Sequence, residues 1–310
     1  MERQFRRALV TGGAGFIGSH LVRALLDHGL EVTVLDDLSS GRRESVDARA
    51  RFQHGDVRDP TDASAALAGV DCVFHLAAKV TIRGSFEHAY VDSDVNLMGT
   101  LNLLRRLPKE GIGQFTFASS MGVYGDAPAP LPIPESHSQQ PISPYGVGKL
   151  AAERMCGLLL DQAKIPFTAL RYFNTFGPGQ AFTPYVGVIT IFIHRLLRGE
   201  PITIFGNGEQ CRDFVHVSDI VEGTVASLHG EPGVYNLGTG RATSLNTLAS
   251  LLVRRIRPDA RIEHQPEHPG ELRYSVAEIA AAEKALGYRP SKSLETSIDG
   301  VIEAIRRESA

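Results

Sequence analysis

The stretch TGGAGFIG, from Thr11 to Gly18, decides the fold expected of this chain. It follows the apolar run RALV and opens a helical pattern with apolar residues at Ile17, Leu21 and Leu25. Glycines permit a tight turn and let backbone amides approach a pyrophosphate, and the helix N-terminus then faces the anion. A strand, glycine loop and helix in this order therefore predict a dinucleotide site that uses Gly12, Gly15 and Gly18.

The second strand pattern, EVTVLD, ends in an acid that indicates which dinucleotide is bound. Asp36 lies 18 residues after Gly18. A carboxylate at this place accepts both hydroxyls of an adenosine ribose and repels a 2′-phosphate, which favours NAD over NADP. Arg42 and Arg43 follow soon after and are the alternative determinant, because they would attract a phosphate.

The first half of the chain alternates short apolar runs with helical patterns. Strand patterns occur at 70–78, 114–120 and 167–174, and a long helix pattern follows Pro144. This alternation predicts an α/β fold, a doubly wound parallel sheet of the Rossmann type. From Gly177 the turns become denser, so we expect an NAD-binding domain at 1–175 and a smaller C-terminal α/β domain at 176–310, with segments that return to the first.

Composition narrows the class of protein. The chain has 310 residues, 43% hydrophobic and 22% charged, with a formal net charge of -3. These values are ordinary for a soluble globular protein, and they supply no strong field for nucleic acid or an anionic membrane. The start is not a signal peptide, and no apolar run is long enough to span a bilayer.

Cysteine and histidine spacing predicts neither disulfides nor a metal. Three widely separated cysteines form no disulfide framework and no zinc spacing, which favours a reducing, cytoplasmic compartment. His264 and His268 are four residues apart, but prolines at 266 and 269 keep them from sharing one helical face. We expect no metal site.

The stretch SPYGVGK, from Ser143 to Lys149, carries a candidate base. Tyr145 and Lys149 are four apart and share one helical face, a spacing that is also common for an ordinary surface pair. Beside a nicotinamide the pair has a use, because an ammonium and the cationic ring both favour a phenolate. A tyrosine titrates near 10, so acting near neutrality needs a fall of roughly three units, or about 4 kcal/mol.

A third polar group lies at the end of a strand. Ser120, in FASSMGVYG, can hydrogen-bond the substrate oxygen that loses its proton, because strand C-termini line the ligand crevice of such sheets. Ser119 is the alternative, since adjacent strand residues face opposite ways and only one of the two points into the site.

Six motifs together resemble one known family: TGGAGFIG, HLAA, SSMGVYG, SPYGVGK, RYFNTFGPG and RDFVHVSDI. They are similar to extended short-chain dehydrogenase/reductases, most of all nucleotide-sugar 4-epimerases of the UDP-glucose 4-epimerase type. The resemblance covers nearly the whole chain, with the motifs in the family's order. It implies an enzyme with bound NAD, a UDP-hexose substrate, a nucleotide-sugar-binding C-terminal domain and a homodimer.

Matching these motifs assigns residues to roles. The catalytic positions fall on Ser120, Tyr145 and Lys149, of which the last two also contact the cofactor. The other implied cofactor positions are Gly12, Gly15, Phe16, Ile17, Gly18, Asp36, Asp37, Asp56, Val57, Leu76, Ala77, Ala78, Asn96, Tyr172 and Phe173. For Asp56, in HGDVRD, a role as an acid in a turn is an equal alternative. The implied substrate positions are Ser120, Asn174, Val188, Thr203, Phe205, Arg212, Arg273 and Ser275.

The chain departs from the family near its C-terminus. Many of these epimerases place an arginine before PGD, where this chain reads EHPGELR. His268 therefore takes the arginine's place, and Arg273 is the alternative phosphate ligand. The position that walls the sugar pocket near C2 falls on Ser275, and a small residue there goes with N-acetylated sugars. An alignment shifted by one residue would put the bulky Tyr274 there instead.

The resemblance implies a mechanism with enzyme and non-enzyme rivals. Tyr145 removes the 4-hydroxyl proton, the C4 hydride passes to NAD, and after the keto sugar rotates the hydride returns to its opposite face. A 4,6-dehydratase needs an Asp-Glu pair where this chain has Met121 and Gly122. A 4-ketoreductase is a second rival, and an NAD-sensing regulator is a third that need not keep all three catalytic positions. The segment 176–194 has no Arg or Lys, which favours neutral sugars over a glucuronate.

Overall fold

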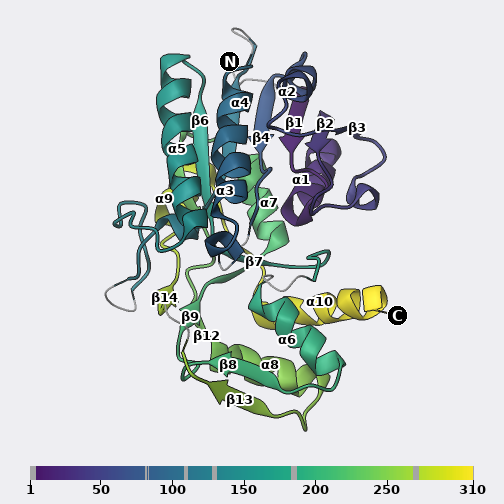
Figure 1. Ribbon diagram of the computed structural model, residues 1–310, viewed down its shortest axis with the longest axis vertical. Coiled ribbons are helices and arrows are strands. Elements are labelled where there is room, and N and C mark those ends of the chain that lie inside the picture. The colour runs from purple at the N-terminus through teal and green to yellow at the C-terminus, as the bar shows by residue number, and fades with distance from the viewer. Residues whose placement is uncertain are drawn as a thin grey trace.

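The computed structural model describes residues 5–80, 82, 84–107, 111–127, 131–182, 187–267 and 272–309. Its larger lobe is built on a seven-stranded parallel sheet with the order β11-β6-β5-β4-β1-β2-β3 (Figure 1). The strands are β1 (Arg7–Thr11), β2 (Glu31–Asp36), β3 (Arg51–His54), β4 (Cys72–His75), β5 (Gln114–Ser120), β6 (Phe167–Tyr172) and β11 (Gly233–Leu237). The doubly wound α/β fold expected from the sequence is confirmed.

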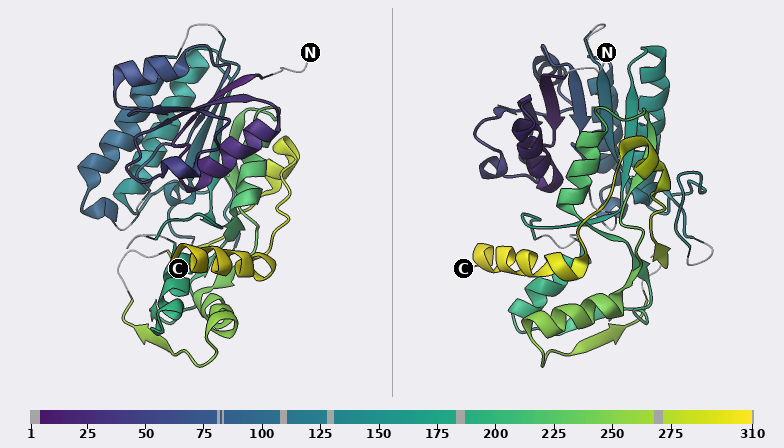
Figure 2. Two further views of the ribbon diagram at one scale, coloured as in Figure 1. Left: turned by 90° about the vertical axis from the view of Figure 1, so that its right-hand side faces the viewer. Right: turned by 180° about the vertical axis from the view of Figure 1, so that it is seen from behind.

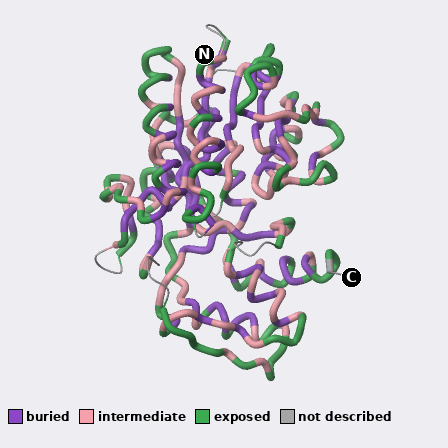
Figure 3. Tube along the Cα trace, in the orientation of Figure 1, coloured by how far each residue is buried: buried purple, intermediate pink, exposed green. Residues whose placement is uncertain are grey.

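Helices cover both faces of this sheet. One face carries α2 (Pro60–Leu67), α4 (Thr100–Leu104) and α5 (Pro144–Gln162), and the other carries α1 (Phe16–Asp27) and α7 (Val217–Ala226). Alternate residues of each strand serve the two cores: Leu9 packs with the first set, whereas Ala8 and Val10 pack with the second. The central strands β4, β5 and β6 are accordingly buried along almost their whole length, whereas the edge strand β3 has no buried residue (Figure 3).

A short helical region precedes α4 near the site. It consists of α3 (Ala89–Ser93) and a π-helix, η3 (Asp94–Gly99), with the single-turn helices η1 (Arg43–Ser45), η2 (Gly84–Phe86) and η4 (Met121–Val123) elsewhere in the lobe. The region α3–η3 packs beside α5. It therefore flanks the N-terminal half of the helix that carries Tyr145 and Lys149.

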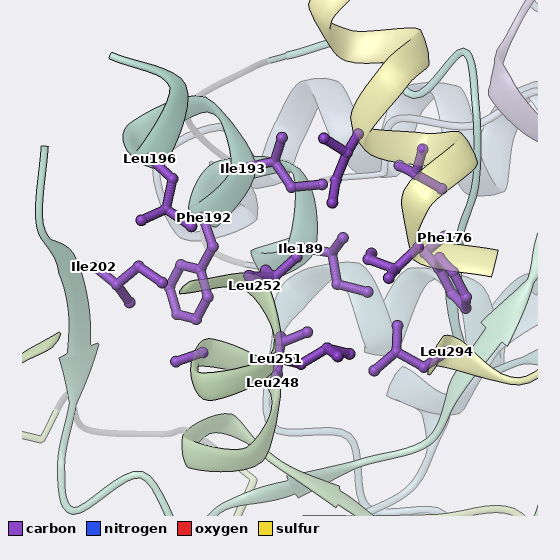
Figure 4. Close-up of a cluster of buried hydrophobic side chains, with 14 of the residues drawn as sticks. Phe176, Ile189, Phe192, Ile193, Leu196, Ile202, Leu248, Leu251, Leu252 and Leu294 are labelled. Atoms are coloured by element: carbon purple, nitrogen blue, oxygen red, sulfur yellow. The ribbon is translucent and has the colours of Figure 1, made fainter. Parts of the chain in front are cut away.

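The smaller lobe has its own apolar core. It contains α6 (Val188–Leu197), α8 (Leu245–Ile256), α10 (Leu294–Ser309) and the parallel pair β8 (Ile202–Phe205) and β13 (Ile262–Gln265). Side chains of the three helices and β8 meet in one cluster, drawn in Figure 4. Figure 2 shows the two lobes one above the other, with α10 at the C-terminus lying across the smaller lobe.

Short strands join the lobes. β7 (Asn174–Phe176) pairs with β10 (Phe214–His216), and β9 (Cys211–Arg212) lies between β12 (Thr243–Ser244) and β14 (Tyr274–Ser275). After entering the smaller lobe the chain returns to the larger one. β11 is a strand of the larger sheet, and α7 and α9 (Ala280–Leu286) pack against that sheet. We propose the division between domains at residue 175, inside β7, with these returning segments assigned to the larger lobe.

Candidate active site

The glycine loop lies at the carboxyl end of β1, against the segment after β4. Gly12 has φ +72°, and a Cβ there would lie 2.7 Å from the Ala77 nitrogen. A Cβ on Gly18 would lie 2.1 Å from the Gly12 oxygen, so both positions require glycine. Gly15 is the N-cap of α1, and within the described chain no side chain caps that end and no acid lies in its first turn. The loop therefore fits the anionic pyrophosphate of a dinucleotide.

Asp36 is held beside this loop at the end of β2. Its Oδ2 accepts from the Ala14 nitrogen at 2.9 Å and its Oδ1 from the Leu38 nitrogen at 2.9 Å. Burial raises the pKa of the carboxyl, and the two backbone donors oppose that shift. Each oxygen keeps acceptor capacity for a ribose hydroxyl. Arg43, one of the alternative determinants, places its guanidinium over the Phe52 ring, 4.6 Å from the centroid.

Several other predicted cofactor residues stabilise the surrounding loops. Asp37 accepts from the Ser39 nitrogen and hydroxyl, at 2.9 and 2.6 Å. Asp56 pairs with Arg58, 2.6 Å between Oδ2 and Nη2, and this arginine lowers the pKa of the carboxyl. These contacts favour the alternative of a turn acid for Asp56. Val57, the next residue, is buried in the core beneath.

The residues after β4 and in η3 lie at the same edge of the sheet. Leu76 and Ala77 donate their backbone N–H groups to the Thr11 backbone and side chain, at 3.1 and 3.2 Å. Asn96 uses both ends of its amide on the Lys79 backbone, accepting at 2.8 Å and donating at 3.0 Å. Ala78 lies between these two anchored points, so the whole segment is fixed next to the glycine loop.

Two predicted cofactor residues at the end of β6 have buried side chains. The Tyr172 hydroxyl is 2.8 Å from Thr224 Oγ1 on α7, and both side chains are buried. The side chain of Tyr172 thus faces α7, in keeping with the alternation of side chains along β6. Phe173 is 3% exposed and packs in a core with residues of β5, β6 and β11. The cofactor roles of both residues stay predictions.

The candidate base lies in the first turn of α5. Ser143 caps this helix by accepting from the Gly146 nitrogen at 3.1 Å, and Pro144 occupies the first position. Ser85 Oγ accepts from the Tyr145 nitrogen at 3.1 Å, which ties η2 to the same turn. Tyr145 is consequently held in place by its backbone, while its ring is 5% exposed.

Ser120, rather than Ser119, faces Tyr145. The Ser120 Oγ and the Tyr145 ring both lie beside Gly122, where a Cβ would be 3.4 Å from the one and 3.6 Å from the other, and the Oγ accepts from the Gly122 nitrogen at 3.1 Å. Ser119 instead donates to Glu153 Oε2 at 2.6 Å. The two serines point to opposite faces of β5, as neighbouring strand residues do, and the geometry favours Ser120 for contact with substrate.

Burial dominates the electrostatics of this cluster. It raises the pKa of Tyr145 to about 12, against the opposing hydrogen bond of Ser120, and the charge of Asp92 adds to the rise. Burial also lowers the pKa of Lys149 to about 8, an effect that Cys156 and Glu153 oppose. The Lys149 Nζ lies 4.4 Å from the centroid of the Phe117 ring. Without ligands Tyr145 is therefore a neutral phenol that needs added positive charge to act as a base.

His75 is a buried residue of the site that the sequence analysis did not single out. Its Nδ1 is 2.7 Å from Thr11 Oγ1 and its Nε2 is 2.8 Å from Thr100 Oγ1. Burial lowers its pKa to about 3, with a smaller contribution from Lys149, so it stays neutral. His75 is the first residue of the HLAA motif. A histidine at the end of a strand pattern does not indicate that its ring joins Thr11 and Thr100.

The predicted substrate residues occupy the strands between the lobes. Asn174, on β7, has a buried Nδ2 that finds no partner within the described chain, as expected of a donor that awaits a ligand. Arg212, on β9, is in register with Ser275 on β14. Thr203 and Phe205 lie on β8, and Val188 begins α6, farther into the smaller lobe.

Arg273 and Ser275, near the C-terminal motif, differ in exposure. The Arg273 side chain is 78% exposed and lies 3.8 Å from Glu267. Ser275 is fully buried, and its Oγ has no partner within the described chain. The neighbouring Tyr274 is partly exposed. The substrate roles of Arg273 and Ser275 stay predictions. His268 lies outside the described residues. Across those that are described, no cluster of metal-binding side chains occurs.

Comparisons with known proteins agree with this geometry. The sequence pattern of the NAD dependent epimerase/dehydratase family matches residues 8–238. The UDP-glucose 4-epimerase of Mycolicibacterium smegmatis is 35% identical over 315 residues, 98% of this chain and 99% of the relative. The crystal structure of UDP-glucose 4-epimerase with UDP-glucose from Thermotoga maritima has a TM-score of 0.94 at 36% identity, covering 98% of this chain and 100% of that one. The UDP-N-acetylglucosamine 4-epimerase of Methanobrevibacter ruminantium has a TM-score of 0.92 at 32% identity, covering 99% and 100%.

Proposed function

The chain belongs to the NAD-dependent epimerase/dehydratase family, and from this premise we propose that it inverts C4 of a UDP-hexose, interconverting UDP-glucose and UDP-galactose. One observation carries the proposal. Ser120 and Tyr145 lie together beside Gly122 at the carboxyl edge of the sheet, with Lys149 one helical turn further along α5. The glycine loop lies at the same edge. The proton of the sugar 4-hydroxyl and the hydride of C4 can therefore both be transferred at this place.

Tyr145, Ser120 and Lys149 have different roles in the proton transfer. Tyr145 accepts the proton of the sugar 4-hydroxyl and later returns it, while Ser120 hydrogen-bonds the same oxygen. Lys149 contributes positive charge, which favours the phenolate form of Tyr145. When bound, NAD supplies the hydride acceptor and then the donor at C4, so each cycle leaves it unchanged.

The cofactor is held by the chain's own backbone and one acid. The free N–H groups at the start of α1 bind the pyrophosphate, and Asp36 accepts the adenosine ribose hydroxyls. On the substrate side, the unpartnered Asn174 amide and the Arg212 guanidinium bind the diphosphate. For the sugar itself we propose neutral hexoses, with the N-acetylhexosamine forms as additional substrates.

We also propose a homodimer. The α5 residues Val147, Met155 and Leu158 form an exposed apolar stripe, with Leu158 71% exposed. Tyr90, 85% exposed, and Met98, 54% exposed, continue it onto α3 and η3, which pack beside α5. A second copy of the chain covers this stripe in the proposal. Leu158→Glu should halve the mass measured by analytical ultracentrifugation, and a wild-type monomer would overturn the dimer.

The location of the protein remains a proposal as well. Among the described residues, no helix is both long and apolar enough to cross a membrane. All three cysteines are free thiols, and Cys72 and Cys156 are buried. Free thiols favour a reducing compartment, and we propose the cytoplasm.

The deciding experiment is incubation of the purified protein with a panel of nucleotide sugars and no added reductant, followed by chromatographic separation of products. We expect UDP-glucose and UDP-galactose to interconvert to equilibrium. Product that forms only with stoichiometric reductant would make the protein a 4-ketoreductase, and loss of water from the sugar would make it a dehydratase. No turnover with any sugar, together with retained NAD binding, would favour a regulator.

A further inference from the structure

A buried ion pair lies directly behind the catalytic cluster. Arg171, the last residue but one of β6, donates from Nε to Glu153 Oε2 at 3.1 Å and from Nη2 to Glu153 Oε1 at 2.6 Å. The two side chains are 2% and 3% exposed. Replacing such a pair with apolar side chains of similar volume is often neutral or stabilising, so stability alone does not account for it.

The same carboxylate reaches the strand that carries Ser120. Ser119 donates to Glu153 Oε2 at 2.6 Å, and Ser119 is joined to Ser120 by one peptide bond. Holding the Ser119 side chain on one face of β5 fixes the direction of the Ser120 hydroxyl on the other face. That hydroxyl is the one that lies next to the Tyr145 ring, beside Gly122.

Glu153 also shares a helical face with the base and its lysine. Tyr145, Lys149 and Glu153 occur at successive intervals of four on α5, and all three are buried. The charge of Glu153 favours the ammonium form of Lys149, against the effect of burial. The other groups at Lys149 are Cys156 on its own helix, neutral His75 on β4 and the Phe117 ring on β5.

The far end of Arg171 extends the network to the next strand of the sheet. Its Nη1 donates to the Tyr124 hydroxyl at 2.8 Å and to the Glu135 carbonyl at 3.0 Å. The Tyr124 hydroxyl donates in turn to Asn236 Oδ1 on β11 at 2.7 Å. The guanidinium is therefore fixed on both sides, and through it so is Glu153.

We propose that Glu153 is a positioning residue, held by Arg171, that sets the direction of the Ser120 hydroxyl through Ser119 and supports the charge of Lys149. The inference rests on the proposed function of this site. It predicts that Glu153 acts on turnover rather than on substrate binding, because it touches neither reactant.

Three variants test the proposal. Ser119→Ala removes the link to Ser120 and leaves every charge in place. It should lower kcat by about 10- to 100-fold, the loss expected for a misplacement of roughly 1 Å, with KM and the pH profile unchanged. The double variant Glu153→Met with Arg171→Met removes both members of the ion pair, so neither is left buried without the other. It should lower kcat similarly, and the alkaline limb of its kcat profile should move to lower pH, because Lys149 loses its ammonium earlier.

Thr116→Val is the matched control. Thr116 lies on the same strand, is fully buried and is 2.8 Å from Ser227 Oγ, away from Glu153. The Thr116→Val variant should melt at a temperature similar to that of Ser119→Ala and keep the wild-type kcat.

A wild-type kcat in Ser119→Ala, or an equal loss of kcat in Thr116→Val, would overturn the positioning role. If the double variant does not fold, these two single variants still decide whether Glu153 has that role. An unmoved alkaline limb in a folded double variant would overturn the support of Lys149. Absence of epimerase activity in the wild-type protein would count against the proposed function instead, so the two failures are distinguishable.

Discussion

The ionisation of Tyr145 should depend on the bound cofactor, and the structure sets the size of the effect. Burial raises the pKa of this phenol to about 12 in the ligand-free chain. Acting as a base near pH 7.5 requires a fall of roughly four to five units, or about 6 kcal/mol. One positive charge at roughly 5 Å, with an effective dielectric constant of about 20, supplies about 3 kcal/mol. The Lys149 ammonium is already present in the ligand-free chain, so the nicotinamide ring is the one charge that binding of NAD adds. We therefore expect bound NAD to lower the pKa of Tyr145 by about two units, which is about half of this requirement.

The assay measures the tyrosinate absorbance of the protein during a pH titration. The absorbance of the Tyr145→Phe variant is subtracted from that of the wild type, so that the signal of the other tyrosines cancels. In the NAD-loaded wild type the phenolate of Tyr145 should appear about two units below its midpoint in the NAD-free chain. Lys149→Met should move its midpoint about two units higher, since it removes about half of the stabilisation. The NAD-free chain should show no Tyr145 phenolate below about pH 11. An NAD-free midpoint near neutrality, or an unchanged midpoint in Lys149→Met, would refute the reasoning.

Four further outcomes are expected. Tyr145→Phe should lower kcat by about two to four orders of magnitude while calorimetry shows intact UDP-sugar binding, and near-wild-type turnover would end its assignment as the base. The protein should release NAD on denaturation, identified by chromatography, and mainly NADP would mean that Arg42 or Arg43 overrides Asp36. His75 has a folded-state pKa of about 3, below its unfolded value, so its contribution to stability is full above about pH 6.5 and is lost as pH falls toward 3. Melting temperatures should therefore fall over that range less steeply in His75→Gln, and parallel curves would contradict this. Ser275→Tyr should abolish turnover of UDP-N-acetylglucosamine and spare UDP-glucose, and a wild type inactive on the acetylated sugar would exclude Ser275 as the determinant.

Local patterns in the sequence were sufficient for the parts of the site that depend on neighbouring residues. The glycine loop is encoded within one strand-loop-helix unit, and the spacing of Tyr145 and Lys149 gives them one face of a helix. Choosing between Ser119 and Ser120 required knowing which face of β5 meets α5. The sequence shows only that neighbouring residues of a strand point to opposite faces of the sheet. Which face each of the two serines takes depends on how β5 packs in the folded chain.

Long-range pairings lay beyond the patterns. Arg171 is a charge inside the strand pattern FTALRYFN, which signals a buried group that needs a partner. Its partner Glu153 could not be inferred, because the pairing depends on α5 crossing both β5 and β6. Ser275 was predicted from the resemblance to wall the sugar pocket, and its complete burial follows from the packing of β14 rather than from its size.

The position of β11 has a consequence for how the chain acquires its structure. This strand covers the edge of β6, yet it is synthesised only after the chain has passed through the smaller lobe. A nascent or truncated chain that ends near residue 175 exposes the backbone of β6 as a free edge and lacks Asn236, the acceptor of the Tyr124 hydroxyl. Unpaired edges of apolar sheets promote association between chains. Folding of the larger lobe is therefore completed by the C-terminal half, which supplies the strand that covers this edge.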